Sequence, residues 1–218
     1  MIREKNYKLI SNATSKEKNI SFGHQISYEW KHDAKHLCFS LSRYKFVSKM
    51  FEGYDSVLEI GTGEGFKSRI VSQSVINLTL SDYTNIYKKL YTADKNTKYI
   101  IHNFQKQKLN KKYQGIYALD VIEHIQKKNE NKFIINILHS LKKKGVLIFG
   151  CPTIESQKYA SKLSKLGHIN CKNKTVLKKL MLKYFHNVFS FSMNDEVLHT
   201  GFDKMSHYIF VLCTGKKV

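Results

Sequence analysis

The sequence predicts an α/β fold, a Rossmann-like, seven-stranded and mostly parallel sheet with an antiparallel last strand and helices on both faces. Short apolar runs alternate with helix-length segments through most of the chain, which is typical of βαβ units. Only the last two runs lack room for a helix between them, so the final strand is expected to run antiparallel beside its neighbour. The chain of 218 residues has no break in composition, and we expect one structural domain.

The expected elements follow from the apolar and β-branched runs and from the helical periodicity between them. Strands are expected at 56–60, 76–80, 98–102, 115–119, 145–150, 187–193 and 207–213. Helices are expected near 66–73, 84–92, 129–142 and 174–184. Residues 1–50 look helical, and we expect them to cap the site of a main domain at 51–218.

The composition argues against export and against a membrane span. The start of the chain has no apolar run after its charges, and nowhere do about 18 apolar residues follow one another. The four cysteines are far apart, which fits neither a disulfide framework nor a zinc ribbon. We therefore expect a cytoplasmic protein.

The formal net charge of +20 raises the question of nucleic-acid binding. Residues 156–194 hold eight lysines and no acidic residue. The whole chain has only three arginines, however, and arginine is the residue that binds phosphate and guanine through two parallel hydrogen bonds. Abundant lysine is also what an AT-rich genome would encode, so the charge alone does not decide between function and composition.

The segment VLEIGTGEGF, at 57–66, indicates a cofactor site. It has the pattern of a buried strand, a glycine-rich turn and a helix start, where the backbone can approach a ligand closely and free N–H groups face it. The next expected strand ends near Asp82, about 20 residues further on, where an acid commonly binds the hydroxyls of a ribose. The alternative is a glycine-rich connection without a ligand.

Several motifs, in this order, resemble those of class I S-adenosylmethionine-dependent methyltransferases: Glu59, Gly61, Gly63, Asp82, IHNF at 101–104 and GIYALDVIEHI at 115–125. The resemblance covers residues 55–213, and an antiparallel last strand is itself a mark of that fold. A nicotinamide-binding domain, the alternative, usually spaces its glycines G-x-G-x-x-G, whereas the spacing here is G-x-G-x-G. The expected cofactor is therefore S-adenosylmethionine.

The resemblance also implies which residues bind this cofactor. The glycine loop would pass under its methionine part, Asp82 would hold the ribose and Tyr83 would lie against the adenine. Where the family often has an acid for the adenine amino group, this chain has Asn103, whose amide oxygen can still accept a hydrogen bond. The full expected set is Glu59, Gly61, Thr62, Gly63, Asp82, Tyr83, Asn103, Phe104 and Leu119.

The candidate catalytic segment is LDVIEHI, at 119–125, directly after the fourth expected strand. It resembles a segment of the ubiquinone-pathway O-methyltransferases and of the enzyme that methylates the terminal 2′-hydroxyl of plant small RNAs. An unactivated alcohol needs a general base or a metal that acidifies it, and His124, with Asp120 beside it, is the candidate base. The small-RNA enzyme holds a divalent cation with matching residues, which implies a site for Mg²⁺, Mn²⁺, Fe²⁺ or Zn²⁺ formed by Asp120, Glu123, His124 and His168.

Simpler interpretations of this segment stay open. It is also the pattern of a helix start, with Asp120 as the cap and Glu123 completing a capping box.

Methylation of an exocyclic amine of a base is disfavoured. Enzymes that carry it out commonly have an N/D-P-P-Y/F loop at this place, and this chain does not, because Pro152 is its only proline.

The expected acceptor is a hydroxyl of a sugar or of a nucleotide-linked glycan precursor. The segments RYKFVSKM, GHINCKN and HNVFSFSMNDEVLHTGF resemble small methyltransferases encoded among bacterial capsule and surface-polysaccharide genes. A quinone is less favoured, since no apolar entry for its long tail can be identified. Candidate acceptor contacts, each of which is alternatively an ordinary packing or surface residue, are Asn194, Asp195, Glu196, His199, Tyr28, Trp30, His32, His36 and Tyr44.

Two other classes of function remain. An RNA 2′-O-methyltransferase is favoured by the lysine-rich stretch and by the small-RNA resemblance. A binding module with an inactive site is disfavoured by the intact Gly61, Gly63, Asp82 and His124. No feature of the sequence indicates an oligomeric state.

Overall fold

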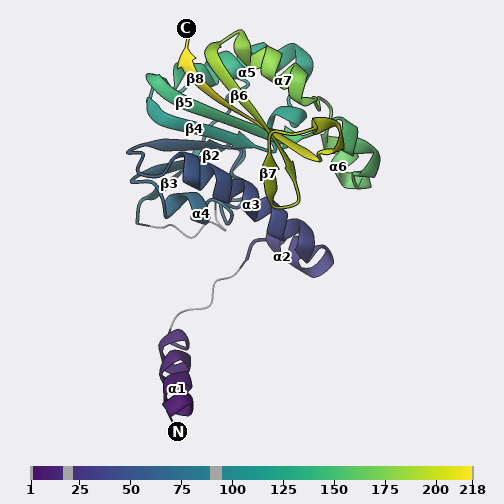
Figure 1. Ribbon diagram of the computed structural model, residues 1–218. Coiled ribbons are helices and arrows are strands. Elements are labelled where there is room, and N and C mark those ends of the chain that lie inside the picture. The colour runs from purple at the N-terminus through teal and green to yellow at the C-terminus, as the bar shows by residue number, and fades with distance from the viewer. Residues whose placement is uncertain (1, 17–21, 89–94, 218) are drawn as a thin grey trace.

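The computed structural model describes residues 2–16, 22–88 and 95–217. Its centre is one eight-stranded sheet with the strand order β3-β2-β1-β4-β5-β8-β6-β7 (Figure 1). The strands from β3 to β5 are parallel neighbours, whereas β8 runs antiparallel to both β5 and β6. The expected fold class and the antiparallel last strand are thereby confirmed. The strands are β1 (Val57–Ile60), β2 (Leu78–Asp82), β3 (Thr97–Ile101), β4 (Tyr113–Leu119), β5 (Leu141–Pro152), β6 (Phe185–Asn194), β7 (Val197–His199) and β8 (Tyr208–Lys216).

The eighth strand, β7, was not expected. It is three residues long and pairs antiparallel with β6. Asp195 and Glu196 form the exposed turn between the two strands, and Asp195 has a positive φ of 48°. Three residues are too few to show a strand period, which is why the sequence pattern missed this hairpin.

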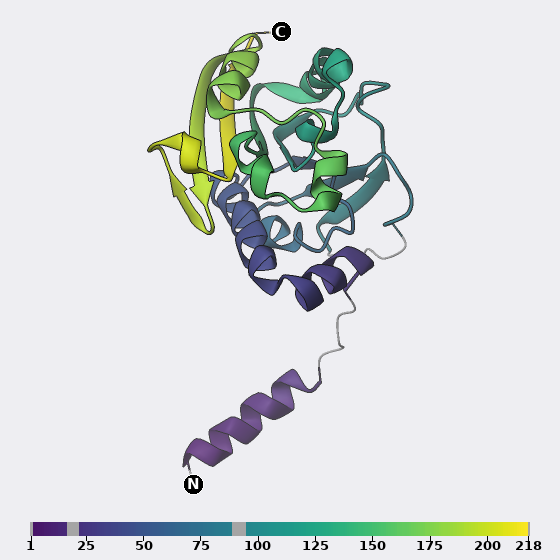
Figure 2. The ribbon, with the colours of Figure 1, turned by 90° about the vertical axis from the view of Figure 1, so that its right-hand side faces the viewer.

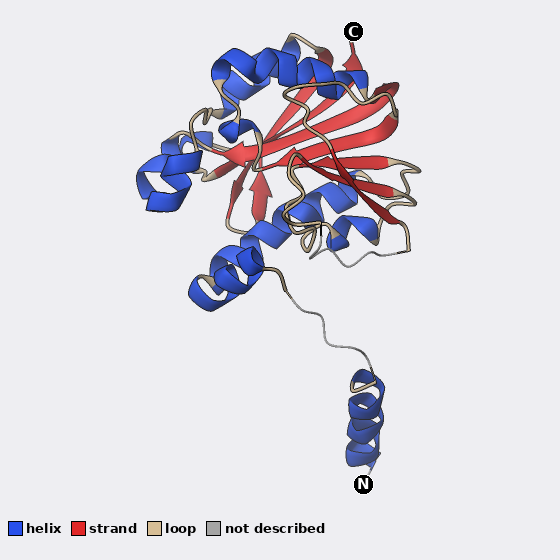
Figure 3. Ribbon diagram, turned by 180° about the vertical axis from the view of Figure 1, so that it is seen from behind, coloured by secondary structure: helices blue, strands red, loops and turns tan. Residues whose placement is uncertain are grey.

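Helices cover the sheet on both faces, as expected. On one face lie α3 (Ala34–Met50) and α4 (Arg69–Ser72), and on the other lie α5 (Lys127–His139) and α7 (Lys174–Leu182) (Figure 1, Figure 2, Figure 3). Alternate residues of β1 point to opposite faces: Leu58 and Ile60 join the core under α5 and α7, and Val57 joins the core under α3 and α4. The carboxyl ends of the parallel strands lie between these two layers.

Some helices differ from their expected bounds. The helix expected at 66–73 is the four-residue α4, because the glycine-loop turn extends to residue 68. In the helix expected at 84–92, residues 85–88 form a bend and a turn, and residues 89–92 lie outside the described residues. The helix α6 (Lys162–Gly167) was not expected.

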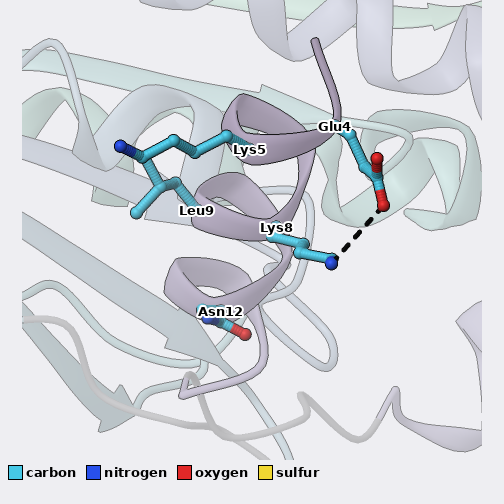
Figure 4. Close-up of a pocket in the computed structure, with 5 residues that line it drawn as sticks. All are labelled: Glu4, Lys5, Lys8, Leu9 and Asn12. Carbon is cyan, nitrogen blue, oxygen red and sulfur yellow. Dashed lines mark ion pairs between the residues drawn. The ribbon is translucent and has the colours of Figure 1, made fainter. Parts of the chain in front are cut away.

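The N-terminal helices differ in their placement. α2 (His24–His32) and α3 pack against the body, whereas α1 (Ile2–Thr14) lies apart from it (Figure 2). Residues 3–16 are all exposed. A shallow surface of α1 is lined by Glu4, Lys5, Lys8, Leu9 and Asn12, with a Lys8–Glu4 ion pair of 3.4 Å (Figure 4). Among the described residues of the expected cap at 1–50, those of α2 and α3 reach the carboxyl edge of the sheet, and those of α1 do not.

Candidate active site

The expected motifs meet at the carboxyl edge of the sheet. β1, β2 and β4 are parallel, so the segments that follow them leave the sheet at the same edge. These segments are the glycine loop, the turn after Asp82 and residues 120–125. Candidate residues from three distant parts of the sequence therefore share one region.

Glu59 lies below the glycine loop, where it is buried and hydrogen-bonded. The hydroxyl of Tyr44 donates to its Oε1 at 3.1 Å, and that of Tyr117 donates to its Oε2 at 2.6 Å. Burial raises the pKa of Glu59, and the hydroxyl donors around the carboxylate oppose this rise. Both carboxylate oxygens accept bonds from the protein itself, so Glu59 anchors α3 and β4 beneath the loop. Tyr44, expected as an acceptor contact, is part of this anchor.

The glycine loop has the backbone conformation that its sequence predicts. Gly61 and Gly63 have positive φ angles of 77° and 55°. A Cβ at Gly61 would lie 2.4 Å from Cγ2 of Val121, so the loop passes close to the start of the catalytic segment. The hydroxyl of Thr62 lies 2.9 Å from that of Ser68, which closes the loop from below.

Asp82 holds the glycine loop and its own turn together. Its Oδ2 accepts from the N–H of Gly63 at 3.0 Å, and its Oδ1 accepts from the N–H of Thr84 at 3.2 Å. The hydroxyl of Tyr99 donates to the carbonyl of Gly63 at 3.1 Å. The end of β2 and the glycine loop are therefore one hydrogen-bonded unit.

The remaining cofactor candidates are placed in different ways. Tyr83 is exposed at this edge, and Oδ1 of Asn103 accepts from the N–H of Gln105 at 2.9 Å. Phe104 and Leu119 are buried in the two cores on opposite faces of the sheet. Their side chains thus belong to the packing beneath the edge.

α2 lies over the glycine loop through contacts that the sequence did not reveal. The carboxylate of Glu64 accepts from the N–H groups of Gln25 at 2.9 Å and Ile26 at 3.3 Å, at the positive end of the helix. The pair of Lys67 and Glu29, at 3.2 Å, adds a second link. The glycine loop and the first turn of α2 therefore hold each other.

Asp120 pairs with an arginine, Arg43, that no sequence motif marks. Nη1 of Arg43 donates to both carboxylate oxygens of Asp120, and the guanidinium lies 3.9 Å from the centre of the Tyr208 ring. Asp120 has a positive φ of 56°. The sequence holds one hint of this pair. Arg43 is one of only three arginines, and arginine is preferred over lysine in buried ion pairs.

The capping-box interpretation of the catalytic segment is wrong. The segment forms a single 3₁₀ turn, η1 (Ile122–His124), without a side-chain cap, and the next helix begins only at Lys127. Glu123 is completely buried, and neither of its carboxylate oxygens has a hydrogen-bond partner among the described residues. Burial, together with the nearby Asp120 carboxylate, raises the pKa of Glu123 well above its usual value.

Glu123, His124 and His168 come together as a group that could hold a metal. One possible ligand atom from each of them lies within 4.8 Å of the other two. His168 comes from the segment after β5, as expected. Asp120, the fourth expected ligand, is not part of this group and has Arg43 as its partner.

Hydrogen bonds fix the orientation of both imidazole rings. Nδ1 of His124 lies 2.8 Å from the carbonyl oxygen of Gly167, and Nδ1 of His168 lies 2.8 Å from Oε1 of Gln157. The side-chain NH₂ of Gln157 donates to the carbonyl of Thr153 at 3.1 Å, which turns its oxygen toward His168. Since both partners of the rings are acceptors, each Nδ1 carries the proton and each Nε2 keeps a free lone pair.

A buried polar network joins the two segments of this group. The N–H of Asn170 donates to the carbonyl of Glu123 at 2.9 Å, and its side chain donates to the carbonyl of Ile125 at 2.9 Å and to Glu130 at 2.8 Å. Lys172 is buried and pairs with Glu130 at 2.5 Å. The segment that carries His168 is thereby fixed against the turn that carries Glu123 and His124.

The acceptor candidates are spread around this edge. Nε2 of His199 lies 3.4 Å from Oδ1 of Asn194 across the β6–β7 hairpin, whose turn carries the exposed Asp195 and Glu196. Tyr28 and His32 contact each other on α2, with ring centres 4.4 Å apart. Trp30 is exposed on the same helix, and His36 packs edge-on against Phe39.

Comparison with known proteins identifies the family. Residues 22–187 match the family described as "Methyltransferase domain". The chain belongs to this family. It is an S-adenosylmethionine-dependent methyltransferase domain, and S-adenosylmethionine is its cofactor, as the order of its motifs predicted.

None of the helices in the described part of the chain is long and apolar enough to cross a membrane.

Individual relatives are distant. The ubiquinone biosynthesis O-methyltransferase of Rickettsia canadensis (strain McKiel) is 29% identical over 124 residues, which are 55% of this chain and 49% of that protein. The chain thus spans about half the length of this curated relative. The structure of a DhpI–SAH complex has a TM-score of 0.63 and 11% identity, covering 88% of this chain and 91% of that one. The methyltransferase domain of bacterial CtHen1-C has a TM-score of 0.65 and 16% identity, covering 81% and 98%.

Proposed function

We propose that this protein transfers the methyl group of S-adenosylmethionine to a hydroxyl of a sugar or of a nucleotide-linked glycan precursor, as in capsule or surface-polysaccharide synthesis. The observation that carries the O-methyl assignment is the buried carboxylate of Glu123, which has no hydrogen-bond partner in the described part of the chain and lies beside His124 and His168. With His124 as a base, or with a cation held by these three residues, the group is suited to removing the proton of an alcohol, whereas a neutral amine can attack before it loses its proton. The curated relative is itself named an O-methyltransferase.

The residues fit a divalent cation. Glu123 offers a desolvated carboxylate, and the two histidines offer Nε2 lone pairs with their Nδ1 protons held by acceptors. One oxygen and two nitrogen ligands suit Mn²⁺, Fe²⁺ or Zn²⁺ better than Mg²⁺, which prefers oxygen ligands. When bound, a cation at Glu123, His124 and His168 would lower the pKa of an acceptor hydroxyl.

The chain's own residues supply the remaining roles that we propose. The glycine loop and Asp82 would bind the cofactor, and His124 would take up the proton if no metal is needed. Asn194, His199, Tyr28 and His32 are the proposed contacts to the polar acceptor. α2 and α3 would cap the site, and the four free cysteines support a cytoplasmic location.

RNA 2′-O-methylation is the second candidate. The observations that favour it are the eight lysines at 156–194 and the likeness in fold to a bacterial CtHen1 domain. The aromatic residues that could stack on bases, Tyr28 and Trp30, lie on α2. We rank it second because Arg43 is committed to Asp120 and is not available for phosphate.

A labelled-methyl assay tests both candidates. The full chain is given labelled S-adenosylmethionine and either a panel of nucleotide sugars and oligosaccharides or a single-stranded RNA, after treatment with EDTA and with each metal added back. We expect methylated sugar, with activity restored by Mn²⁺, Fe²⁺ or Zn²⁺. Methylation of RNA alone would replace the first candidate by the second, and full activity without metal would leave His124 as the base.

Metal binding is tested separately by calorimetry with Mn²⁺ and Zn²⁺. We expect His168→Ala and Glu123→Gln to lose at least about tenfold in metal affinity, because each removes one ligand. Asp120→Asn is the matched control, and its affinity should stay close to that of the wild type. An equal loss in Asp120→Asn would show that Asp120 leaves Arg43 to join the ligands.

A further inference from the structure

Exposed apolar side chains gather on two neighbouring segments at the carboxyl edge. We call them the rim, and each of them is more than half exposed. The rim consists of Ile154, Tyr159, Leu163, Leu166, Ile169, Phe202 and Met205. Single exposed apolar residues are normal on any protein, but a group of large ones on adjacent elements marks an interaction surface.

The two segments form one surface beside the active site. The 3₁₀ turn η2 (Glu155–Tyr159) contacts the 3₁₀ turn η3 (Asp203–Met205), and the hydroxyl of Thr153 donates to the carbonyl of Ser206 at 2.8 Å. α6 ends at Gly167, whose carbonyl holds His124. Figure 2 looks onto this edge and shows α6, in green, toward the viewer. The rim therefore borders the group of Glu123, His124 and His168.

The apolar side chains of α6 share one side of the helix. Leu163 and Leu166 are three residues apart, so they project from the same face. The helix has no buried residue at all. Its apolar face is thus not part of the core and is turned away from the protein.

Lysines are interleaved with the rim. Lys158, Lys162, Lys165 and Lys204 are exposed on the same segments. Of the two acidic residues there, Glu155 is only partly exposed and Asp203 lies 3.8 Å from the ammonium of Lys174. These four lysines form no ion pair with a described carboxylate. A surface that combines aliphatic side chains with such basic residues matches the boundary between the acyl chains and the phosphates of an anionic lipid layer.

We propose that the rim docks on the surface of an anionic lipid bilayer. Leu163, Leu166 and their apolar neighbours enter the acyl boundary, and the lysines pair with lipid phosphates. Single-stranded RNA fits this surface less well, because its bases need aromatic or arginine faces and the rim is mainly aliphatic. Docking brings the mouth of the active site to the lipid head groups, so that, if the proposed function holds, the hydroxyl acceptor is a glycan precursor carried on a lipid.

Vesicle co-sedimentation of the full chain tests the docking. We expect binding to vesicles of phosphatidylcholine mixed with phosphatidylglycerol, and at least about tenfold weaker binding to phosphatidylcholine alone, since the lysines contribute only at an anionic surface. Binding should fall when salt is raised, because ions screen exposed charges. Equal binding to both kinds of vesicle would overturn the proposal.

Two pairs of matched variants locate the surface. Leu163→Glu with Leu166→Glu should lose vesicle binding by about tenfold or more, because the apolar face no longer enters the lipid. Ile76→Glu with Ile135→Glu, two exposed isoleucines away from the rim, should bind as the wild type does. Replacing Lys158, Lys162 and Lys165 by serine should likewise weaken binding, whereas replacing the exposed Lys142, Lys143 and Lys144, at the opposite edge of the sheet, should not.

Two further measurements keep this test separate from the proposed function. Circular dichroism and S-adenosylmethionine binding should be unchanged in all four variants, since none of these residues lies in the cofactor site. Vesicle binding does not depend on which acceptor is methylated, so the docking can hold even if the sugar assignment fails. Unaltered vesicle binding in the Leu163→Glu, Leu166→Glu variant, or binding to RNA that outcompetes vesicles, would refute the docking surface.

Discussion

Nη1 of Arg43 lies 2.9 Å from each carboxylate oxygen of Asp120. This pair joins α3, which precedes the sheet, to the residue that leaves the fourth strand with a positive φ of 56°. The Arg43 side chain is almost completely buried, whereas that of Asp120 is 38% exposed. The pair therefore fixes the start of the segment 119–125 against α3.

Removing this arginine should destabilise the protein and misplace the catalytic segment. We expect Arg43→Met to lower the free energy of unfolding by roughly 1–3 kcal/mol, less than the loss of a fully buried pair because water still reaches Asp120. The rate of methyl transfer should fall by more than the smaller fraction of folded protein explains. Urea denaturation and turnover measure the two effects, and Arg3→Met on the exposed α1 is the control. Unchanged stability would mean that the pair does not form in solution.

The close approach of Gly61 to Val121 predicts that a substitution at Val121 compensates for the loss of stability caused by Gly61→Ala. Gly53 has nearly the same φ as Gly61, 78° against 77°, but a Cβ there would meet no atom within 4 Å. Gly53→Ala should therefore cost only the backbone strain, about 1–2 kcal/mol, and Gly61→Ala should cost about 1–3 kcal/mol more through the clash.

Combining Gly61→Ala with Val121→Ala removes the methyl group that clashes and should bring the cost back toward that of Gly53→Ala. A double-mutant cycle of unfolding free energies measures this coupling. If Gly61→Ala and Val121→Ala are simply additive, the loop does not lie against Val121.

Gln157 should control metal affinity without binding the metal. Its Oε1 holds the Nδ1 proton of His168, so Gln157→Leu should weaken the binding of Zn²⁺ or Mn²⁺ by about 10–100-fold. Gln157→Glu keeps an acceptor at this place and should retain most of the affinity. Calorimetry on the three proteins provides the comparison, and an equal loss in both variants would argue against the hydrogen bond as the cause.

Asp82 should contribute to cofactor binding through its charge. We expect Asp82→Asn to weaken the binding of S-adenosylmethionine by about tenfold or more, because hydrogen bonds to a charged group are stronger than those to a neutral one. Asp55→Asn, at the opposite end of the neighbouring strand, is the matched control. A normal dissociation constant in Asp82→Asn would remove Asp82 from the cofactor site.

The cysteines should react with iodoacetamide in an order set by burial and pKa. Cys38 is exposed and should be alkylated first. Burial raises the pKa of Cys171 to about 11, which leaves little thiolate at neutral pH. Cys151 and Cys213 are completely buried and should react last. Mass spectrometry of peptides follows the four rates, which should become equal in urea, and early labelling of Cys213 would contradict the buried position of β8.

Much of the fold could be predicted from the sequence because long apolar runs have a clear period. Seven strands, the helices α5 and α7 and the antiparallel last strand all came from such runs. Two elements escaped for the same reason, since β7 has three residues and α6 buries none of its side chains, and the helix expected at 66–73 is reduced to the four residues of α4. A hydrophobic period needs several residues with buried side chains, and these elements are too short or too exposed to show one.

The grouping of the candidate site residues could be predicted where a motif and a strand end coincide. Gly61, Gly63, Asp82 and the turn with Glu123 and His124 follow strands, so the topology brings them together. The sequence did not reveal three residues, Arg43, Glu64 and Gln157. Each of them contacts a residue that is distant in the sequence, and no local pattern indicates that partner. The same holds for Asp120, whose place beside Arg43 depends on the packing of α3.

The two hydrogen bonds between Glu64 and the first turn of α2 tie this helix to the glycine loop, so the two segments would move together. A change in the loop's shape on ligand binding would pass to Gln25 and Ile26 through these two bonds. The side of the mouth that α2 forms would then be set before the acceptor arrives. In kinetic terms this favours an obligatory order of addition, with the methyl donor first and the acceptor second.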